Sequence, residues 1–163
     1  MRTPLLLSCA VLLPLLGGCG HRLVSQDYGF SVEFPRTPVE QPGKNYQGLP
    51  RTLWTLEDDS AQEFFSAEAT TYQQPLNPSA NWIPAGTELS SVGVQTVGAR
   101  RYTMRSTTGR DVLAIATTSR QTLTGAMIDS IFIVDGKTLI SVTARSPSER
   151  RRTEFLKSLK LLH

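Results

Sequence analysis

The strongest constraint on the fold is a pair of apolar runs joined by a tight-turn signal. Residues 126–134 and 137–145 flank Asp135-Gly136. An Asp-Gly pair between apolar runs favours a β-hairpin with a two-residue type I′ turn, which requires positive φ. The first run has apolar side chains at both odd and even positions, as a strand does when both of its faces are buried. We therefore expect a central strand here, covered on two sides.

Alternating apolar and polar residues predict the other strands of the sheet. They cover residues 28–34, 51–57, 62–72, 99–106 and 110–119. Turn residues at positions 58–60 and 108–109 should join four of these strands into two hairpins. Residues 35–48 contain three Pro and two Gly and are expected to form a loop, and residues 73–91 are broken by Pro, with or without a short helix. The sequence thus predicts one antiparallel sheet of about six or seven strands.

A helix is expected at the C-terminal end. Ser146 as N-cap, Pro147 as first helical residue and Glu149 three residues after the cap form a capping box. An apolar stripe at helical spacing follows, at Phe155, Leu156, Leu159 and Leu162. The stripe should pack on one face of the sheet, so the predicted fold class is α+β.

The N-terminal residues are predicted to form a signal peptide rather than part of the fold. Arg2 precedes an apolar run over residues 4–18, which is shorter than the roughly 20 residues of a bilayer-spanning helix and ends in small residues. The exit, Leu16-Gly17-Gly18-Cys19, resembles the lipobox of bacterial lipoproteins. The resemblance implies cleavage of residues 1–18 and acylation of Cys19. The alternatives are an ordinary signal peptide or an uncleaved anchor, with Cys19 incidental.

On this interpretation residues 19–26 are a lipidated tether and residues 27–163 a single domain, with the lipid bilayer as its first partner. Two or more acyl chains hold a protein stably on a membrane, whereas one gives marginal attachment. The residue after Cys19 is Gly20 rather than Asp. By resemblance to enterobacterial lipoproteins, this favours the outer membrane, facing the periplasm, over the inner membrane.

Both ends of the remaining chain resemble a family of secreted bacterial domains. The segment Tyr28-Gly29-Phe30-Ser31-Val32-Glu33-Phe34-Pro35 matches its opening, and the hairpin and helix over residues 127–162 match its end. This group is similar to the PsbP and Mog-type α/β/α fold, which implies an antiparallel sheet flanked by helices. Family members usually have a longer central helix where this chain has residues 73–91. The family has no common catalytic residues, and the resemblance implies a binding or accessory role.

Composition gives little support for catalysis. Both Cys lie at or before Cys19, and the two His, His21 and His163, lie in the expected tether and at the last position. These positions argue against a Ser-His-Asp triad, a thiol nucleophile or a zinc site. The net charge of +3 falls further when Arg2 is removed, so nothing favours nucleic acid. We expect a non-enzymatic protein without cofactor or metal.

Three residues, Arg101, Arg105 and Trp82, are candidates for binding. Arg101 and Arg105 share one strand face, near Arg100 and Arg110, and could bind phosphate headgroups, lipopolysaccharide or an acidic partner. The alternative is a solvated basic face. Trp82 could anchor a partner or fold back over the core.

The function most consistent with these features is a membrane-anchored binding or accessory module of the cell envelope. One alternative is a periplasmic carrier of a small apolar ligand, with a cavity between sheet and helix. A remote alternative is a hydrolase that uses carboxylates alone. Its acids would come from the cluster over residues 57–63, which otherwise forms a solvated acidic turn.

Overall fold

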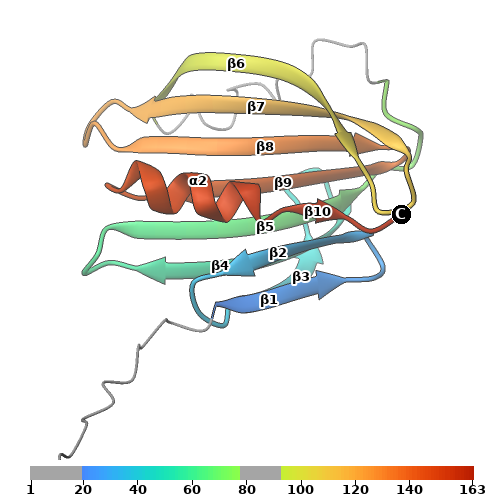
Figure 1. Ribbon diagram of the computed structural model, residues 1–163, viewed down its shortest axis with the longest axis horizontal. Coiled ribbons are helices and arrows are strands. Elements are labelled where there is room, and N and C mark those ends of the chain that lie inside the picture. Colours follow the sequence, from blue (N-terminus) through green and yellow to red (C-terminus); the bar gives the residue numbers. More distant parts are fainter. Residues whose placement is uncertain (1–19, 78–92) are drawn as a thin grey trace, which may run out of the picture.

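The structure, a computed structural model, describes residues 20–77 and 93–163, and these form two antiparallel sheets and a helix (Figure 1). The larger sheet has the order β3-β4-β5-β9-β8-β7-β6 and the smaller one β1-β2-β10. The large sheet comprises β3 (Val39–Lys44), β4 (Pro50–Asp58), β5 (Glu63–Thr71), β9 (Thr138–Arg145), β8 (Met127–Asp135), β7 (Asp111–Gln121) and β6 (Val94–Arg105). The small sheet comprises β1 (His21–Ser25), β2 (Phe30–Phe34) and β10 (Lys160–Leu161), and the helix is α2 (Glu149–Lys157).

The seven-stranded antiparallel sheet with a helix on one face was predicted, but the fold class was not. The described residues are mostly β-structure with one short helix, so α+β overstates the helical content. A single sheet is also wrong, because β1, β2 and β10 form a second one beside α2 (Figure 1). Its pairs join segments far apart in the chain, such as Lys160 with Ser31, and local patterns do not reveal such pairs.

Two segments expected to lack strands contain them. Residues 21–25, within the expected tether, pair with β2 over their whole length, from His21 opposite Phe34 to Ser25 opposite Phe30. Residues 39–44, within an expected loop, pair with β4 as an edge strand. Pro42 fits there because an edge strand leaves one row of backbone N–H groups unpaired.

The three predicted hairpins, β4–β5, β6–β7 and β8–β9, are all present. The last of them turns one residue later than expected. Asp135 pairs with Thr138, so Gly136 and Lys137 form the two-residue loop. Of the two, only Gly136 has positive φ, at 58°. A positive φ at the first loop position alone fits a type II′ turn rather than type I′.

The helix begins later and ends earlier than predicted. Ser148 is the N-cap, and its side chain accepts a hydrogen bond from the Arg151 backbone N–H at 3.3 Å. Ser146 does not cap the helix: its Oγ accepts a hydrogen bond from the backbone N–H of the N-cap residue Ser148 at 3.1 Å, and its hydroxyl donates to Glu63 Oε1 at 2.8 Å. At the other end, α2 stops at Lys157 because the following residues pair with β2 as β10.

The core lies between the large sheet and the layer formed by α2 and the small sheet (Figure 1). Phe155 of α2 packs edge-on against Phe34 and Phe65, with ring centroids 5.0 Å away in each case. In β8 both Phe132 and Ile133 are buried, although they point to opposite faces. The prediction of a strand buried on both faces is confirmed for this part of β8.

Candidate binding groove

A groove runs between α2 and the outer half of the large sheet. The helix packs over β8 and β9, so it leaves the same face of β6 and β7 uncovered. On that face β7 presents small side chains, Ala114, Ala116 and Thr118, whereas the neighbouring β6 presents Arg100 and Tyr102. Because small side chains lie between larger neighbours, a trough forms above β7.

The groove has a volume of about 820 Å³, within the range of small-molecule sites. Its apolar lining comes from three directions. The floor is formed by Ala116 and Ile131, one wall by Tyr102 and Met104, and the other wall by Leu156 and Leu159. Ile131 and Leu159 are buried and the rest of this lining is half-buried, so apolar surface remains accessible from the groove.

Cationic side chains surround this lining. Arg100 lies over the ring of Tyr102, with the guanidinium carbon 5.3 Å from the ring centroid. Burial raises the pKa of Tyr102, and the charge of Arg100 opposes that rise to a lesser extent. Arg120 and Lys157 also line the groove, and neither forms an ion pair with any residue that the structure describes.

The acidic residues of the groove only partly balance these charges. Asp129 accepts a hydrogen bond from Arg152 at 2.7 Å, so this pair neutralises itself. Glu149, exposed at the start of α2, is the other carboxylate of the lining. Within residues 20–77 and 93–163, three cations without an ion-pair partner therefore face one carboxylate, and this lining is electropositive.

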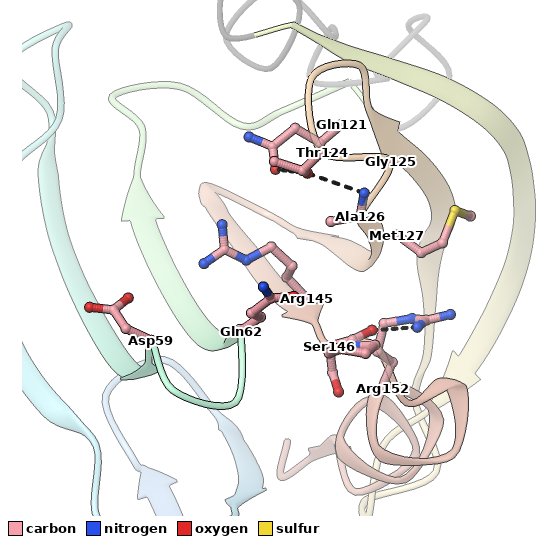
Figure 2. Close-up of a pocket in the computed structure, with 11 residues that line it drawn as sticks. Asp59, Gln62, Gln121, Thr124, Gly125, Ala126, Met127, Arg145, Ser146 and Arg152 are labelled. Carbon is pink, nitrogen blue, oxygen red and sulfur yellow. Dashed lines mark hydrogen bonds between the residues drawn. The ribbon is translucent and has the colours of Figure 1, made fainter.

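A second cavity, of about 520 Å³, lies between the start of α2 and the β7–β8 turn (Figure 2). Some of its polar groups bond to one another, whereas the buried Arg145 Nε has no hydrogen-bond partner among the described residues. The Ala126 backbone N–H donates to Thr124 Oγ1 at 3.2 Å, and Arg152 Nη1 donates to the Ser146 carbonyl at 2.6 Å. Asp59 is the one carboxylate in the lining. A hydrolase that uses carboxylates alone needs two acids at the reacting centre, and the described lining of this cavity supplies one.

The structure separates the predicted arginines from the groove. Arg101 and Arg105 lie on the opposite face of β6 from Arg100, because they alternate with it along the strand. Arg105 pairs with Asp111 at 3.1 Å. Arg110 donates to both carboxylate oxygens of Asp135 at 2.6 Å. The hairpin thus balances much of its own positive charge. Trp82 and Cys19 lie outside the described residues.

The acidic cluster is not a single solvated turn. Hydrogen bonds from Ser60 and from the backbone of Ala61, together with Arg36, lower the pKa of the exposed Asp58. Glu63 is buried, with 4% of its surface exposed. It accepts hydrogen bonds or ion pairs from Ser146 and Arg151, each at 2.8 Å. The prediction of a solvated turn is therefore wrong for Glu63, which fastens α2 to β5.

Sequence reasoning missed Tyr102, Met104, Ala116 and Lys157 as groove residues. The signal that could have found them is the spacing of large side chains at 100, 102 and 104 against small ones at 114, 116 and 118. That signal becomes readable only with the register of β6 against β7, which places Arg100 opposite Ala116. Within residues 20–77 and 93–163, no cluster of His, Cys, Asp or Glu could hold a metal ion. No helix in the same ranges has the length and apolarity to cross a membrane.

Comparison with known proteins shows a likeness at the level of fold. No protein-family model and no curated protein matches the chain. Among solved structures, the chain is similar to cyanobacterial PsbP (CyanoP) from Synechocystis, with a TM-score of 0.60 and 12% sequence identity. The match covers 96% of this chain and 98% of that one. The chain therefore has a PsbP-like fold.

Proposed function

We propose that this protein is a lipid-anchored, non-catalytic binding module of the bacterial cell envelope. Acylated Cys19 holds it on the outer membrane, facing the periplasm, and the groove between α2 and strands β6–β8 is its binding surface. The lipobox-like Leu16-Gly17-Gly18-Cys19 supports the anchor. The groove supports the binding role.

The groove is the observation on which the binding role rests. It combines an apolar floor with cations that have no ion-pair partner in the described part of the chain, and such a surface gains by covering its apolar part and neutralising its charge. A volume of about 820 Å³ is ample for a ligand or for anchor side chains of a partner. Arg101, Arg105 and Trp82 remain secondary candidates for the same role, away from the groove or outside the described residues.

A periplasmic carrier of small apolar ligands is the second candidate. The position of the groove, between the sheet and α2, is the one expected for a carrier cavity, and its volume is sufficient. The lining is not purely apolar, as the cavity of the simplest carrier would be, because Arg100, Arg120 and Lys157 lie beside the apolar residues. The two candidates differ in what occupies the groove and share the site.

Photocrosslinking in cells tests the proposal. A photoreactive phenylalanine analogue replaces Met104, which lines the groove, or Thr103, which is exposed on the opposite face of β6. Each variant is made with and without Cys19→Ser. Mass spectrometry identifies any adduct.

We expect an adduct from position 104 that is absent from position 103 and weakened by Cys19→Ser. Equal adducts from both positions, or none from position 104, would refute the groove as the binding surface. An adduct unaffected by Cys19→Ser, with the protein still in the membrane fraction, would refute the acyl anchor.

A further inference from the structure

The charges of the groove are arranged along its two walls. Arg100 and Arg120 come from adjacent strands, β6 and β7, and Lys157 comes from the last turn of α2. All three side chains belong to exposed residues. A cation held beside accessible apolar surface favours an anionic group attached to an apolar body, because each part of such a ligand meets its complement.

The backbone beneath the groove disfavours one class of occupant. Strand β7 forms the floor, and it is paired with β6 on one side and β8 on the other. It therefore has no free row of backbone N–H and C=O groups to receive a peptide strand. An extended peptide in this groove would gain no backbone hydrogen bonds from the sheet. A hydrocarbon chain needs none.

We propose that this groove binds a single-chain anionic amphiphile, of which a fatty-acid carboxylate is the simplest example. The hydrocarbon chain lies on Ala116, Ile131 and Leu156, and the anionic head lies against Arg100, Arg120 or Lys157. The proposal rests on the proposed function, because it names the ligand class for that same surface. The volume of about 820 Å³ matches one small ligand.

The small side chains of β7 allow a second test, which changes the shape of the groove rather than its charge. Ala116 is half-buried on the groove floor, opposite Arg100 in the β6–β7 register. Replacing it with Leu fills the trough from below while leaving the charges in place. Ala99 is exposed on the other face of β6, so Ala99→Leu is the matched control. For charge, Arg100→Glu is matched by Lys137→Glu, at an exposed residue of the β8–β9 turn that does not line the groove.

The test uses the full-length protein in nanodiscs of zwitterionic phosphatidylcholine. Two diazirine probes of equal chain length are compared, a fatty-acid carboxylate and an alkyl trimethylammonium. After irradiation, mass spectrometry measures the labelling of each peptide. Circular dichroism verifies that each variant keeps its β-structure.

We expect the carboxylate probe to label peptides from β7, β8 and α2 at least about fivefold more than the ammonium probe, the ratio that one surface ion pair provides. Arg100→Glu should lower carboxylate labelling by about the same factor. Lys137→Glu should leave it unchanged. Ala116→Leu should lower the labelling of these peptides by both probes, and Ala99→Leu should lower neither.

Equal labelling by the two probes, or labelling insensitive to both Arg100→Glu and Ala116→Leu, would overturn the proposal. A protein adduct at position 104 in cells would also overturn it, while leaving the groove as the binding surface. If the groove is not a binding surface at all, position 104 should give no specific adduct of any kind, which distinguishes that result from failure of the ligand proposal alone.

Discussion

Arg152 of α2 donates from Nε to Oδ2 of Asp129 on β8 across 2.7 Å, with 8% and 18% of the two side chains exposed. Each partner has further hydrogen bonds. Arg152 Nη1 donates to the Ser146 carbonyl at 2.6 Å, and Thr118 Oγ1 donates to Asp129 Oδ1 at 2.7 Å. Both cavities border Arg152. This ion pair therefore helps to fix the position of α2 between them.

Breaking this pair should destabilise the fold. Arg152→Met leaves the Asp129 carboxylate partly buried without its cation, which typically costs about 3–5 kcal/mol. The double variant with Asp129→Asn removes both charges, so it should lose less than the sum of the two single variants. Urea denaturation followed by circular dichroism measures all three. Additive losses would mean that the pair contributes no coupling energy.

Removing the aromatic ring of α2 should have a comparable effect. Phe155 is 3% exposed and touches both Phe34 and Phe65 edge-on. Phe155→Ala should lower the free energy of unfolding by about 3–5 kcal/mol, because it removes buried surface and leaves a cavity. Lys157→Ala, an exposed change on the same helix, should stay within about 0.5 kcal/mol of the native protein. A small loss at Phe155 would show that α2 is not held by this cluster.

Substitutions in the β8–β9 turn test the assignment of a type II′ turn. Gly136 has a φ of 58°, and a Cβ added there meets no atom within 4 Å. Gly136→Ala should therefore cost about 1–2 kcal/mol through backbone strain alone. Lys137 follows it without a positive φ, so Lys137→Ala should be nearly neutral. Thermal denaturation compares the two, and a larger loss at Lys137 would contradict the type II′ assignment.

The raised pKa of Tyr102 predicts that the stability of the fold depends on pH in the alkaline range. Burial raises this pKa above the ordinary 10.0. As pH rises past that value the unfolded state loses the phenol proton first, so the stability associated with neutral Tyr102 is complete below pH 10.0 and is lost as pH rises through the higher folded pKa.

Ultraviolet titration of phenolate absorbance tests this sign. Tyr102→Phe should remove a component that ionises above pH 10.0. Arg100→Leu should move that component to still higher pH, because the Arg100 charge lowers the pKa of Tyr102. A shift to lower pH would show that Arg100 does not act on this phenol.

Local signals predicted the large sheet well. Each of its three predicted hairpins joins neighbouring segments, and turn residues such as Gly109 and Gly136 mark where the chain reverses. The small sheet escaped prediction because β10 reaches β2 across more than a hundred residues. The helix boundaries failed for the same reason. Ser146 has the chemistry of an N-cap, but it lies before the helix, where its Oγ accepts from the Ser148 N–H and its hydroxyl donates to distant Glu63.

The candidate site was harder to predict because it depends on register. Arg100, Arg101 and Arg105 look alike in sequence, and only the pairing with β7 shows which of them shares a face with the small residues of that strand. Arg152 stands three positions before Phe155, on the same side of the helix, and is buried with it. Its burial depends on Asp129, whose place in the fold no local pattern indicates.

The start of β1 at His21 leaves Gly20 alone between the strand and Cys19. Two residues span at most about 7 Å. With acyl chains on Cys19, the domain would rest on the lipid surface instead of standing off on a stalk. Figure 1 shows the start of β1 and strand β6 on opposite sides of the molecule. The part of the domain nearest the acyl chains is then the small sheet, and the groove lies on the other side of α2 from it.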